Sequence, residues 1–189
     1  MKDAIILASG SPRRRELLEQ IGIPYRTLKC SSPEFTTSTD PVGIVKELSA
    51  RKAQAAAEKE SGIILGADTI VWQDGRVLGK PSDRSDARRM LECLSGREHS
   101  VYTGVTLIRM GEDRTELNRL FLYRETKVRV FRMTQEEIEA YLDTGEPFDK
   151  AGAYGIQGSF AAFIDSIEGD YTNVVGLPVG AVYQALKQI

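Results

Sequence analysis

The chain begins with an apolar segment that changes directly into an amphipathic one, and this change most restricts the possible folds. Residues 4–8 (AIILA) form the short apolar run typical of a buried strand. Leucine and isoleucine side chains then follow at helical spacing over residues 16–21. Ser11 is a favourable N-cap, and Pro12 is suited to the first turn of a helix. We therefore predict a strand, a short loop and a helix at the start of an α/β fold.

The loop between this strand and this helix contains groups that bind anions. Its hydroxyl and guanidinium groups belong to Ser9, Ser11, Arg13, Arg14 and Arg15. The first backbone N–H groups of a helix have no partner within the helix, and together with arginine they favour phosphate. A capped helix with solvated arginines is the alternative on this segment alone, and residues further along the chain must decide.

The rest of the chain alternates between predicted strands and helices. We predict strands at residues 25–29, 63–72, 77–78, 101–110, 120–131 and 160–167. We predict helices at about residues 12–21, 41–60, 81–95 and 134–145, and a last one after residue 178. Charged side chains alternate with uncharged ones within Thr126–Val130, which indicates a strand with one face exposed to solvent. Turn signals such as Asp74-Gly75 join some strands directly and helices join others, so the sequence predicts a mixed sheet.

Length and charge limit the class of protein. With 189 residues the chain has the size of one domain, with room for two lobes that share a core. Its net charge of −2 argues against broad contact with nucleic acid. Apolar runs are too short to span a membrane, and we expect a cytoplasmic protein in which Cys30 and Cys93 are reduced, structural thiols. We interpret His99, the only histidine, as structural.

Asp68 is the strongest candidate for catalysis because it interrupts an otherwise apolar strand. A buried charge is costly unless a cation or a hydrogen-bond donor compensates it. Gly66 and Ala67 are expected to leave space for a ligand beside it. Alternatively, Asp68 caps backbone groups or pairs with a lysine. Glu34 lies in a polar loop; it is either simply solvated or joins Asp68 in holding Mg²⁺ or positioning water.

Three lysines are further candidates. Lys80 lies between Gly79 and Pro81, and Lys150 precedes a glycine-rich segment, so each has a backbone that is locally restricted. Lys52 lies in a predicted helix rich in alanine and charge, where an ordinary exposed residue is the simpler interpretation.

Taken together, six motifs in this order resemble the Maf family of nucleoside triphosphate pyrophosphatases. They are residues 9–14 (SGSPRR), 66–69 (GADT), 79–81 (GKP), 94–96 (LSG), 149–158 (DKAGAYGIQG) and 175–178 (VGLP). The resemblance implies one domain over residues 1–189, with an elongated mixed sheet flanked by helices and two lobes around a central cleft. It relates the fold to the inosine triphosphate pyrophosphatases. It also implies release of pyrophosphate from a nucleoside triphosphate, with a divalent metal such as Mg²⁺ or Mn²⁺ as cofactor.

The resemblance also implies roles for individual residues. Asp68 matches the family's general base for the attacking water, and Glu34 would orient that water or share the metal with Asp68. Positions suited to the triphosphate are Ser9, Arg13, Arg14, Lys52, Lys80 and Lys150. Positions that the family associates with choice of the base are Arg13, Thr69 and Gln157. This combination is similar to the branch acting on dTTP and UTP; the branch acting on 7-methylguanosine triphosphate carries Trp and Glu in place of Arg13 and Gln157.

Two functions remain open at this stage. The first is an enzyme that acts on pyrimidine nucleoside triphosphates, which both carboxylates and all the matched cations favour. The second is a non-catalytic nucleotide-binding regulator of cell division, because members of the family are linked to septum formation. The resemblance further implies a homodimer, although the sequence shows no self-complementary patch.

Overall fold

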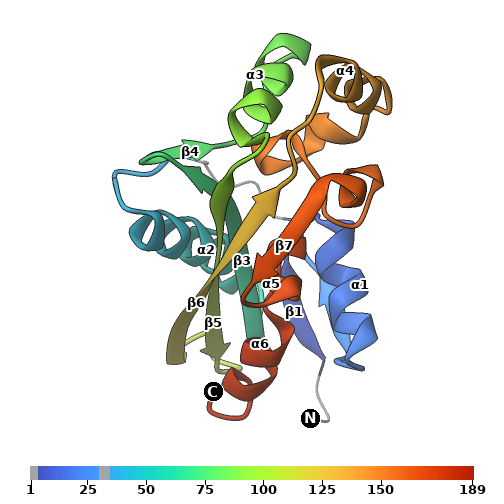
Figure 1. Ribbon diagram of the computed structural model, residues 1–189. Coiled ribbons are helices and arrows are strands. Elements are labelled where there is room, and N and C mark those ends of the chain that lie inside the picture. Colours follow the sequence, from blue (N-terminus) through green and yellow to red (C-terminus); the bar gives the residue numbers. More distant parts are fainter. Residues whose placement is uncertain (1–3, 30–34) are drawn as a thin grey trace. The chain divides into compact units, whose positions relative to one another are not determined.

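The computed structural model of the protein describes residues 4–29 and 35–189. Its strands are β1 Ile5–Ala8, β2 Tyr25–Thr27, β3 Gly62–Gln73, β4 Arg76–Leu78, β5 Glu98–Met110, β6 Glu116–Val130 and β7 Ile164–Glu168 (Figure 1). Its α-helices are α1 Pro12–Gln20, α2 Pro41–Ala57, α3 Arg84–Leu94, α4 Gln135–Asp143, α5 Tyr171–Val175 and α6 Val179–Ala185. Short 3-10 helices lie at η1 Glu146–Asp149, η2 Ala151–Ala153 and η3 Ser159–Phe163.

The strands form a mixed sheet in the order β2-β1-β3-β5-β6-β7, and β4 pairs with β3. β1 runs parallel to both β2 and β3, whereas β4 is antiparallel to β3 and β7 is antiparallel to β6. This confirms the predicted α/β class and the mixed sheet.

The chain divides into two compact units. Unit 1 comprises residues up to Thr69, Thr103–Arg124 and Gly176–Ile189. Unit 2 comprises Ile70–Tyr102 and Glu125–Val175. Strands β3, β5 and β6 each run through both units. The single domain over residues 1–189, and the elongated shape with a cleft between two lobes, stay predictions.

In unit 1, helix α2 lies directly against the sheet at two glycines. A Cβ atom on Gly66 of β3 would lie 2.4 Å from the Ser49 carbonyl oxygen and 2.5 Å from the Ala53 nitrogen, both on α2. A Cβ atom on Gly104 of β5 would lie 2.6 Å from the Val45 carbonyl oxygen. These distances are too short for any side chain, so glycine is required for this close approach. The expectation that Gly66 leaves space for a ligand is therefore wrong, because the backbone of α2 occupies that space.

Small side chains complete this contact and form part of the unit 1 core. The alanines of α2 pack on apolar residues of β1, β3 and β5. The buried members of this cluster are Ile6, Ala8, Ala53, Ala56, Ala57, Ile64 and Ile108. Because α2 lies so close to the sheet, the side chains between them are small ones such as Ala53, Ala56 and Ala57.

Local signals place most element boundaries as predicted. The Asp40 side chain accepts a hydrogen bond from the Gly43 nitrogen at 2.8 Å and begins α2. Thr134 and Glu137 form the predicted capping box of α4. Ser11 stands at the N-cap of α1, but its side chain makes no capping hydrogen bond. Instead, its backbone nitrogen donates to the Ser9 hydroxyl at 3.2 Å.

Two segments differ from the prediction. The strand expected over residues 160–167 is confined to β7, which begins at Ile164, and the residues before it form η3. The carboxylate of Glu146 accepts hydrogen bonds from the Ser159 nitrogen, which favours the turn that begins η3. Helix α5 was not predicted.

No helix among the described residues combines the length and apolar character needed to cross a membrane.

In unit 2, His99 belongs to a buried aromatic cluster. The residue is 3% exposed, and its Nε2 lies 2.7 Å from the Tyr154 hydroxyl. Tyr154 in turn packs against Phe160, which also contacts Tyr141. This environment agrees with the structural interpretation of His99. Cys93 has a free thiol, and Cys30 lies outside the described residues.

The burial of His99 predicts that stability falls at mildly acidic pH. Desolvation lowers the pKa of His99 to about 4 from its ordinary 6.5, and it outweighs the negative charge of Glu98, which acts in the opposite direction. Between these values the unfolded chain binds the extra proton and the folded chain does not, so folding weakens as pH falls. From pH 7.5 to about 5 we expect this histidine to cost about 2 kcal/mol of unfolding free energy, measured by urea denaturation. His99→Phe should remove this part of the pH dependence, and an unchanged dependence would contradict the assignment.

Candidate functional site

The site begins where β1 ends beside the continuing strand β3. The last paired residues of these parallel strands are Ala8 and Gly66. Beyond this pair the chain leaves the sheet through the Ser9–Ser11 loop and enters α1, while β3 continues through Asp68 and Thr69. Ligands of open α/β sheets bind at the carboxyl ends of the parallel strands. The structure therefore brings the predicted anion-binding loop next to the predicted catalytic acid.

Arg14 links the loop to β3 and to the C-terminal part of unit 1. Its side chain is buried, and its Nη1 donates to the Ser9 hydroxyl at 3.2 Å. Its Nη2 donates to Thr69 Oγ1 at 3.1 Å, and its Nε donates to the Gly176 carbonyl at 2.8 Å. Thr69 Oγ1 also lies 2.9 Å from Thr103 Oγ1. Arg14 thus holds Ser9 and Thr69 in fixed positions.

Asp68 forms an ion pair with Lys52 of α2 through its Oδ1 atom. The side chain of Asp68 is 12% exposed and that of Lys52 is 19% exposed. Pairing with a lysine was one of the two alternatives for Asp68, and it is confirmed. That lysine is itself a candidate site residue, so the pairing does not argue against a role in catalysis. The simpler interpretation of Lys52 as an ordinary exposed residue is wrong.

The charges of this region act on one another. Burial lowers the pKa of Arg14, the negative charge of Asp68 raises it, and the positive charge of Arg13 lowers it further. Arg13 is half-buried near the start of α1. Asp68 is therefore within electrostatic reach of Arg14, in addition to its direct contact with Lys52.

Glu34 lies outside the described residues, so its predicted place beside Asp68 stays a prediction. The described residues that follow it are attached to α2 through Glu47. This carboxylate accepts hydrogen bonds from Thr36 Oγ1 at 2.9 Å, from the Thr37 nitrogen at 3.2 Å and from the Ser38 hydroxyl. These hydrogen bonds lower the pKa of Glu47 to about 2. Sequence reasoning missed Glu47, since a glutamate in a helix gives no sign of such a role.

The remaining candidates lie in unit 2. Lys80 is exposed and follows β4, and Lys150 is half-buried and lies between η1 and η2. The Gly152 nitrogen donates to the Gly79 carbonyl at 3.0 Å, so the loops that carry the two lysines are joined. Gln157 is exposed in the same glycine-rich segment as Lys150.

Residues 146–159 form a closed loop that carries Lys150 and Gln157. Its ends are joined because the Glu146 carboxylate accepts from the Ser159 nitrogen at 3.1 and 3.2 Å and from the Ser159 hydroxyl at 3.0 Å. Lys150 Nζ donates to the Glu146 carbonyl at 2.7 Å. The Gly155 nitrogen donates to the Tyr141 hydroxyl at 3.2 Å. Sequence reasoning missed Glu146 as the residue that closes this loop.

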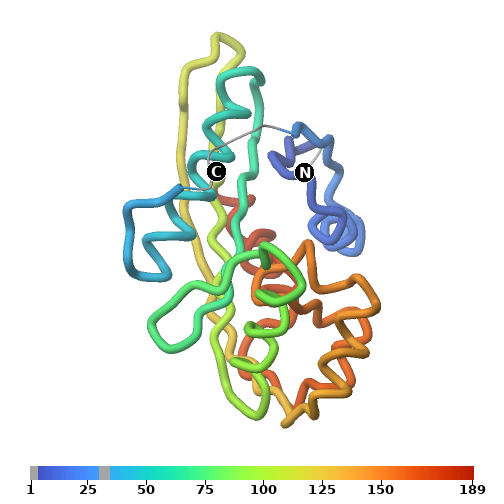
Figure 2. Tube along the Cα trace, turned by 90° about the horizontal axis from the view of Figure 1, so that it is seen from above, coloured from blue at the N-terminus to red at the C-terminus, as the bar shows by residue number. Residues whose placement is uncertain are grey.

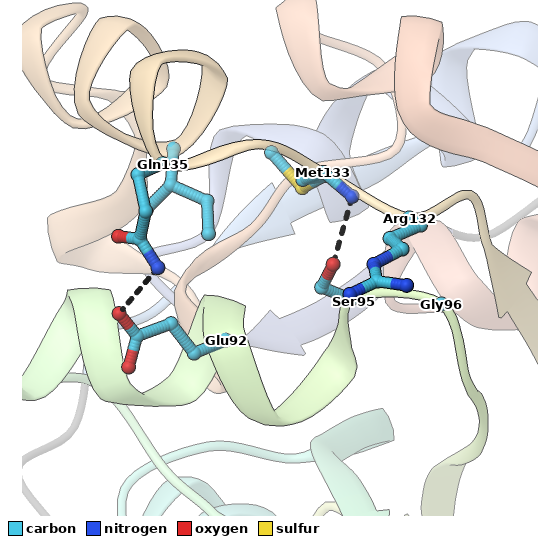
Figure 3. A pocket seen from close by; sticks show the side chains of 7 residues that line it. Glu92, Ser95, Gly96, Arg132, Met133 and Gln135 are labelled. Carbon is cyan, nitrogen blue, oxygen red and sulfur yellow. Dashed lines mark hydrogen bonds between the residues drawn. The ribbon is translucent and has the colours of Figure 1, made fainter.

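A hollow of about 400 Å³ in unit 2 lies apart from these residues. It lies between the end of α3 and the segment before α4, and Figure 3 shows its labelled side chains. The Ser95 hydroxyl accepts from the Met133 nitrogen at 2.8 Å, and Gln135 donates to Glu92 at 3.3 Å. Gly96, with a φ of +71°, follows the end of α3. The motif at residues 94–96 therefore ends a helix, and the hollow contains none of the predicted site residues.

The structure thus assembles the candidates as two groups. Ser9, Arg14, Lys52, Asp68 and Thr69 belong to unit 1, and Lys80 and Lys150 lie on joined loops of unit 2. Contact of both groups with one substrate stays a prediction. Among the described residues, no three His, Cys, Asp or Glu side chains are grouped as metal ligands.

Comparison with known proteins identifies the family. The family model described as Maf-like protein matches residues 4–189. The chain belongs to the Maf family. The resemblance stated from the six motifs is thereby confirmed.

Several close relatives of this Maf chain carry the same name. Proteins named dTTP/UTP pyrophosphatase from Symbiobacterium thermophilum and Caldanaerobacter subterraneus are 52% and 48% identical to it. Each alignment covers 97% of this chain, and they cover 93% and 88% of those proteins respectively. A protein from Agathobacter rectalis that is also named dTTP/UTP pyrophosphatase is 45% identical to this chain. The alignment covers 98% of this chain and 97% of that protein.

A solved structure is similar to the fold of this Maf chain. The HAM1 protein from Coxiella burnetii superposes with a TM-score of 0.55 over 98% of this chain and 99% of its own. Sequence identity is 15%, so this similarity concerns the fold alone.

Proposed function

We propose that the chain is a nucleoside triphosphate pyrophosphatase that hydrolyses dTTP and UTP to the monophosphate and pyrophosphate. The observation that carries the proposal is the Asp68–Lys52 pair beside the Ser9–Ser11 loop and Arg14, just beyond the point where the parallel pairing of β1 with β3 ends. A carboxylate that can act as a base, a cation and an anion-binding loop are groups that support hydrolysis of a phosphoanhydride. The shared name of the relatives supports pyrimidine nucleoside triphosphates as the substrates.

The proposed reaction is in-line attack of water on the α-phosphorus. Asp68 accepts a proton from the water as the new P–O bond forms, and the bond to the oxygen that bridges the α- and β-phosphorus breaks. Pyrophosphate leaves with both electrons of that bond. Lys52, Lys80, Lys150 and Arg13 would balance the charge that develops on the leaving group, because phosphoryl transfer depends mainly on positioning and electrostatics.

Ser9 is suited to donate a hydrogen bond to a phosphate oxygen. Its Oγ already accepts one hydrogen bond from Arg14 and another from the Ser11 nitrogen, each at 3.2 Å. A hydroxyl has two acceptor positions and one proton, so the proton remains for a ligand. Three of the five N–H donors of Arg14 position Ser9, Thr69 and the Gly176 carbonyl, and we retain Arg14 among the residues proposed to bind the triphosphate.

The residues present are compatible with a divalent metal that is bound together with the substrate. Asp68 provides hard carboxylate oxygens, and only its Oδ1 contacts Lys52. Mg²⁺ commonly takes one or two protein carboxylates, with phosphates and water completing its shell. We propose Asp68 and Glu34 as these carboxylates for Mg²⁺ or Mn²⁺. When bound, the ion would neutralise phosphate charge.

Choice of the base is assigned to Gln157, together with Arg13 and Thr69. An amide side chain offers both a donor and an acceptor, which matches the alternating N–H and C=O edge of uracil and thymine. An ionised glutamate only accepts and would suit the donor edge of guanine instead. Exposure of Gln157 in the closed loop is compatible with contact to a nucleotide.

The proposed activity predicts pyrophosphate release that is selective for base and dependent on metal. With Mg²⁺ or Mn²⁺, the chain should convert UTP and dTTP to UMP and dTMP, with equimolar pyrophosphate measured by a coupled phosphate assay. CTP and GTP should react at least about tenfold more slowly in kcat/KM, a loss of the size expected for one unsatisfied polar contact. EDTA should abolish the reaction. Nucleotide binding without turnover would instead identify the regulator, and release of single phosphates would exclude a pyrophosphatase.

A further inference from the structure

Gln157, which the proposed function assigns to choice of the base, lies in a tight turn that is fixed by hydrogen bonds. The Gly158 nitrogen donates to the Gly155 carbonyl at 3.2 Å, which closes the turn around Ile156 and Gln157. Ile156 is buried and Gln157 is exposed, so the turn is anchored in the core and presents its amide outward. The Gly155 nitrogen donates to the Tyr141 hydroxyl at 3.2 Å, which holds the chain before Gln157. The position of Gln157 therefore also depends on what holds the chain after it.

The carboxylate of Glu146 holds the chain on the side after Gln157. It accepts from the Ser159 nitrogen at 3.1 and 3.2 Å and from the Ser159 hydroxyl at 3.0 Å. In the part of the chain that the structure describes, this carboxylate has no other hydrogen-bond donor and no ion pair. In Figure 2 the orange trace of residues 146–159 folds back beside the green helix α3 of the same unit. The contacts of the carboxylate thus serve to close the loop in which Gln157 lies.

Glycine at position 158 gives this carboxylate room. A Cβ atom on Gly158 would lie 2.0 Å from Glu146 Oε2 and 2.7 Å from Glu146 Cδ, so no other residue fits while the carboxylate stays in place. The φ of Gly158 is −93°, a value that other residue types also adopt, so the backbone itself does not require glycine. The requirement for glycine directly after Gln157 therefore comes from Glu146.

We propose that Glu146 is a positioning residue for choice of the base, acting through Gln157. The inference rests on the proposed function, in which the Gln157 amide contacts the base. An amide distinguishes two bases most strongly when its donor and acceptor are held in one orientation, because a free turn must be ordered at each binding event. Lys150 donates to the backbone carbonyl of Glu146 at 2.7 Å, so a change to the carboxylate leaves this contact of Lys150 in place.

Replacement of Glu146 by alanine tests the proposal through selectivity. We expect kcat/KM for UTP to fall by about tenfold, mainly through KM, because the Gln157 contact is no longer prepared before binding. For CTP, whose edge does not match the amide in the same way, kcat/KM should stay within about threefold. The ratio of the two values is measured on one preparation, so it is insensitive to the fraction of the variant that folds. Glu146→Gln keeps an oxygen that accepts from the Ser159 nitrogen and should retain most of the selectivity.

Gly158→Ala disturbs the same contact without changing Glu146. The added methyl group displaces the Glu146 carboxylate from Ser159, so this variant should lose selectivity as Glu146→Ala does. In the Glu146→Ala background the methyl group meets no carboxylate and should have little further effect. Glu137→Ala is the matched control, because the Glu137 carboxylate also accepts from a backbone nitrogen of unit 2, that of Thr134, at 2.7 Å. This control should leave the selectivity unchanged.

These measurements separate the inference from the proposed function. If Glu146→Ala kept the selectivity of the unmodified chain, or if Glu137→Ala lost it equally, the role of Glu146 would be overturned and the pyrophosphatase would stand. Additive effects of Glu146→Ala and Gly158→Ala would overturn it as well. If the unmodified chain released no pyrophosphate, the proposed function would fail. The ratio of Kd values for non-hydrolysable UTP and CTP analogues, measured by calorimetry, would then decide on Glu146, and an unchanged ratio in Glu146→Ala would overturn its role.

Discussion

Replacement of Asp68 by asparagine is expected to lower kcat for pyrophosphate release by about a thousandfold and to leave nucleotide binding within about threefold. The amide has the shape of the carboxylate but cannot accept the proton of the attacking water. Lys52, the Ser9–Ser11 loop and Arg14, which would contact the phosphates, are retained. The effect should therefore appear in kcat, measured by pyrophosphate release, and not in Kd, measured by calorimetry with a non-hydrolysable UTP analogue.

Two comparisons make this result specific to Asp68. Asp113→Asn makes the same chemical change in the exposed turn before β6 and should leave kcat unchanged. Lys52→Met should also reduce kcat, and its combination with Asp68→Asn should be less than additive because the two side chains are in contact. An Asp68→Asn variant that kept a tenth of the normal kcat would show that another group takes the proton.

Local signals account for the parts of the fold that the sequence predicted. The N-cap at Asp40, the capping box at Thr134 and the hairpin at Asp74-Gly75 each depend on residues within three or four positions of one another. Such interactions form in the same way wherever the segment lies, so residue types and spacing are enough to find them.

The parts that were wrong or missing depend on residues far apart in the chain. A strand was predicted where η3 forms, and the first residue of η3, Ser159, is hydrogen-bonded to Glu146, 13 positions earlier in the chain. Gly66 was expected to make room for a ligand, whereas α2 fills that space from residues 49–53. No periodicity or turn rule contains this information.

In the candidate site, too, the sequence revealed local features but not the contacts between residues far apart in the chain. Asp68 was found from the sequence because a charge within an apolar strand is visible without a structure. Its pairing with Lys52, 16 positions away, was only one alternative, and the link from Arg14 to Gly176 spans 162 positions. The family resemblance added Thr69 and Gln157 and gave roles to the other candidates, and the geometry supplied the hydrogen bonds that position Ser9 and Thr69.

Gly66→Ala is expected to destabilise the chain by about 3 kcal/mol and to reduce activity as well. A methyl group at this position would lie 2.4 Å from one backbone atom of α2 and 2.5 Å from another, and backbone cannot rotate away as a side chain can. The helix must therefore shift away from β3. Because Lys52 lies on the same turn of α2, the shift would also separate it from Asp68. Urea denaturation measures the first effect, and pyrophosphate release measures the second.

Gly180→Ala is the matched control for this prediction, because it adds the same methyl group to the same unit where nothing lies within 4 Å. Gly180 is within α6, where alanine is the better helix former, so stability should be unchanged or slightly higher. If Gly66→Ala cost no more than this control, α2 would not be held at its observed distance from β3. If it lost stability but kept full kcat, the contact of Lys52 with Asp68 would be dispensable for catalysis. If Gly66→Ala lost both stability and kcat while Gly180→Ala lost neither, the Lys52–Asp68 pair would depend on the absence of a side chain at position 66 of β3.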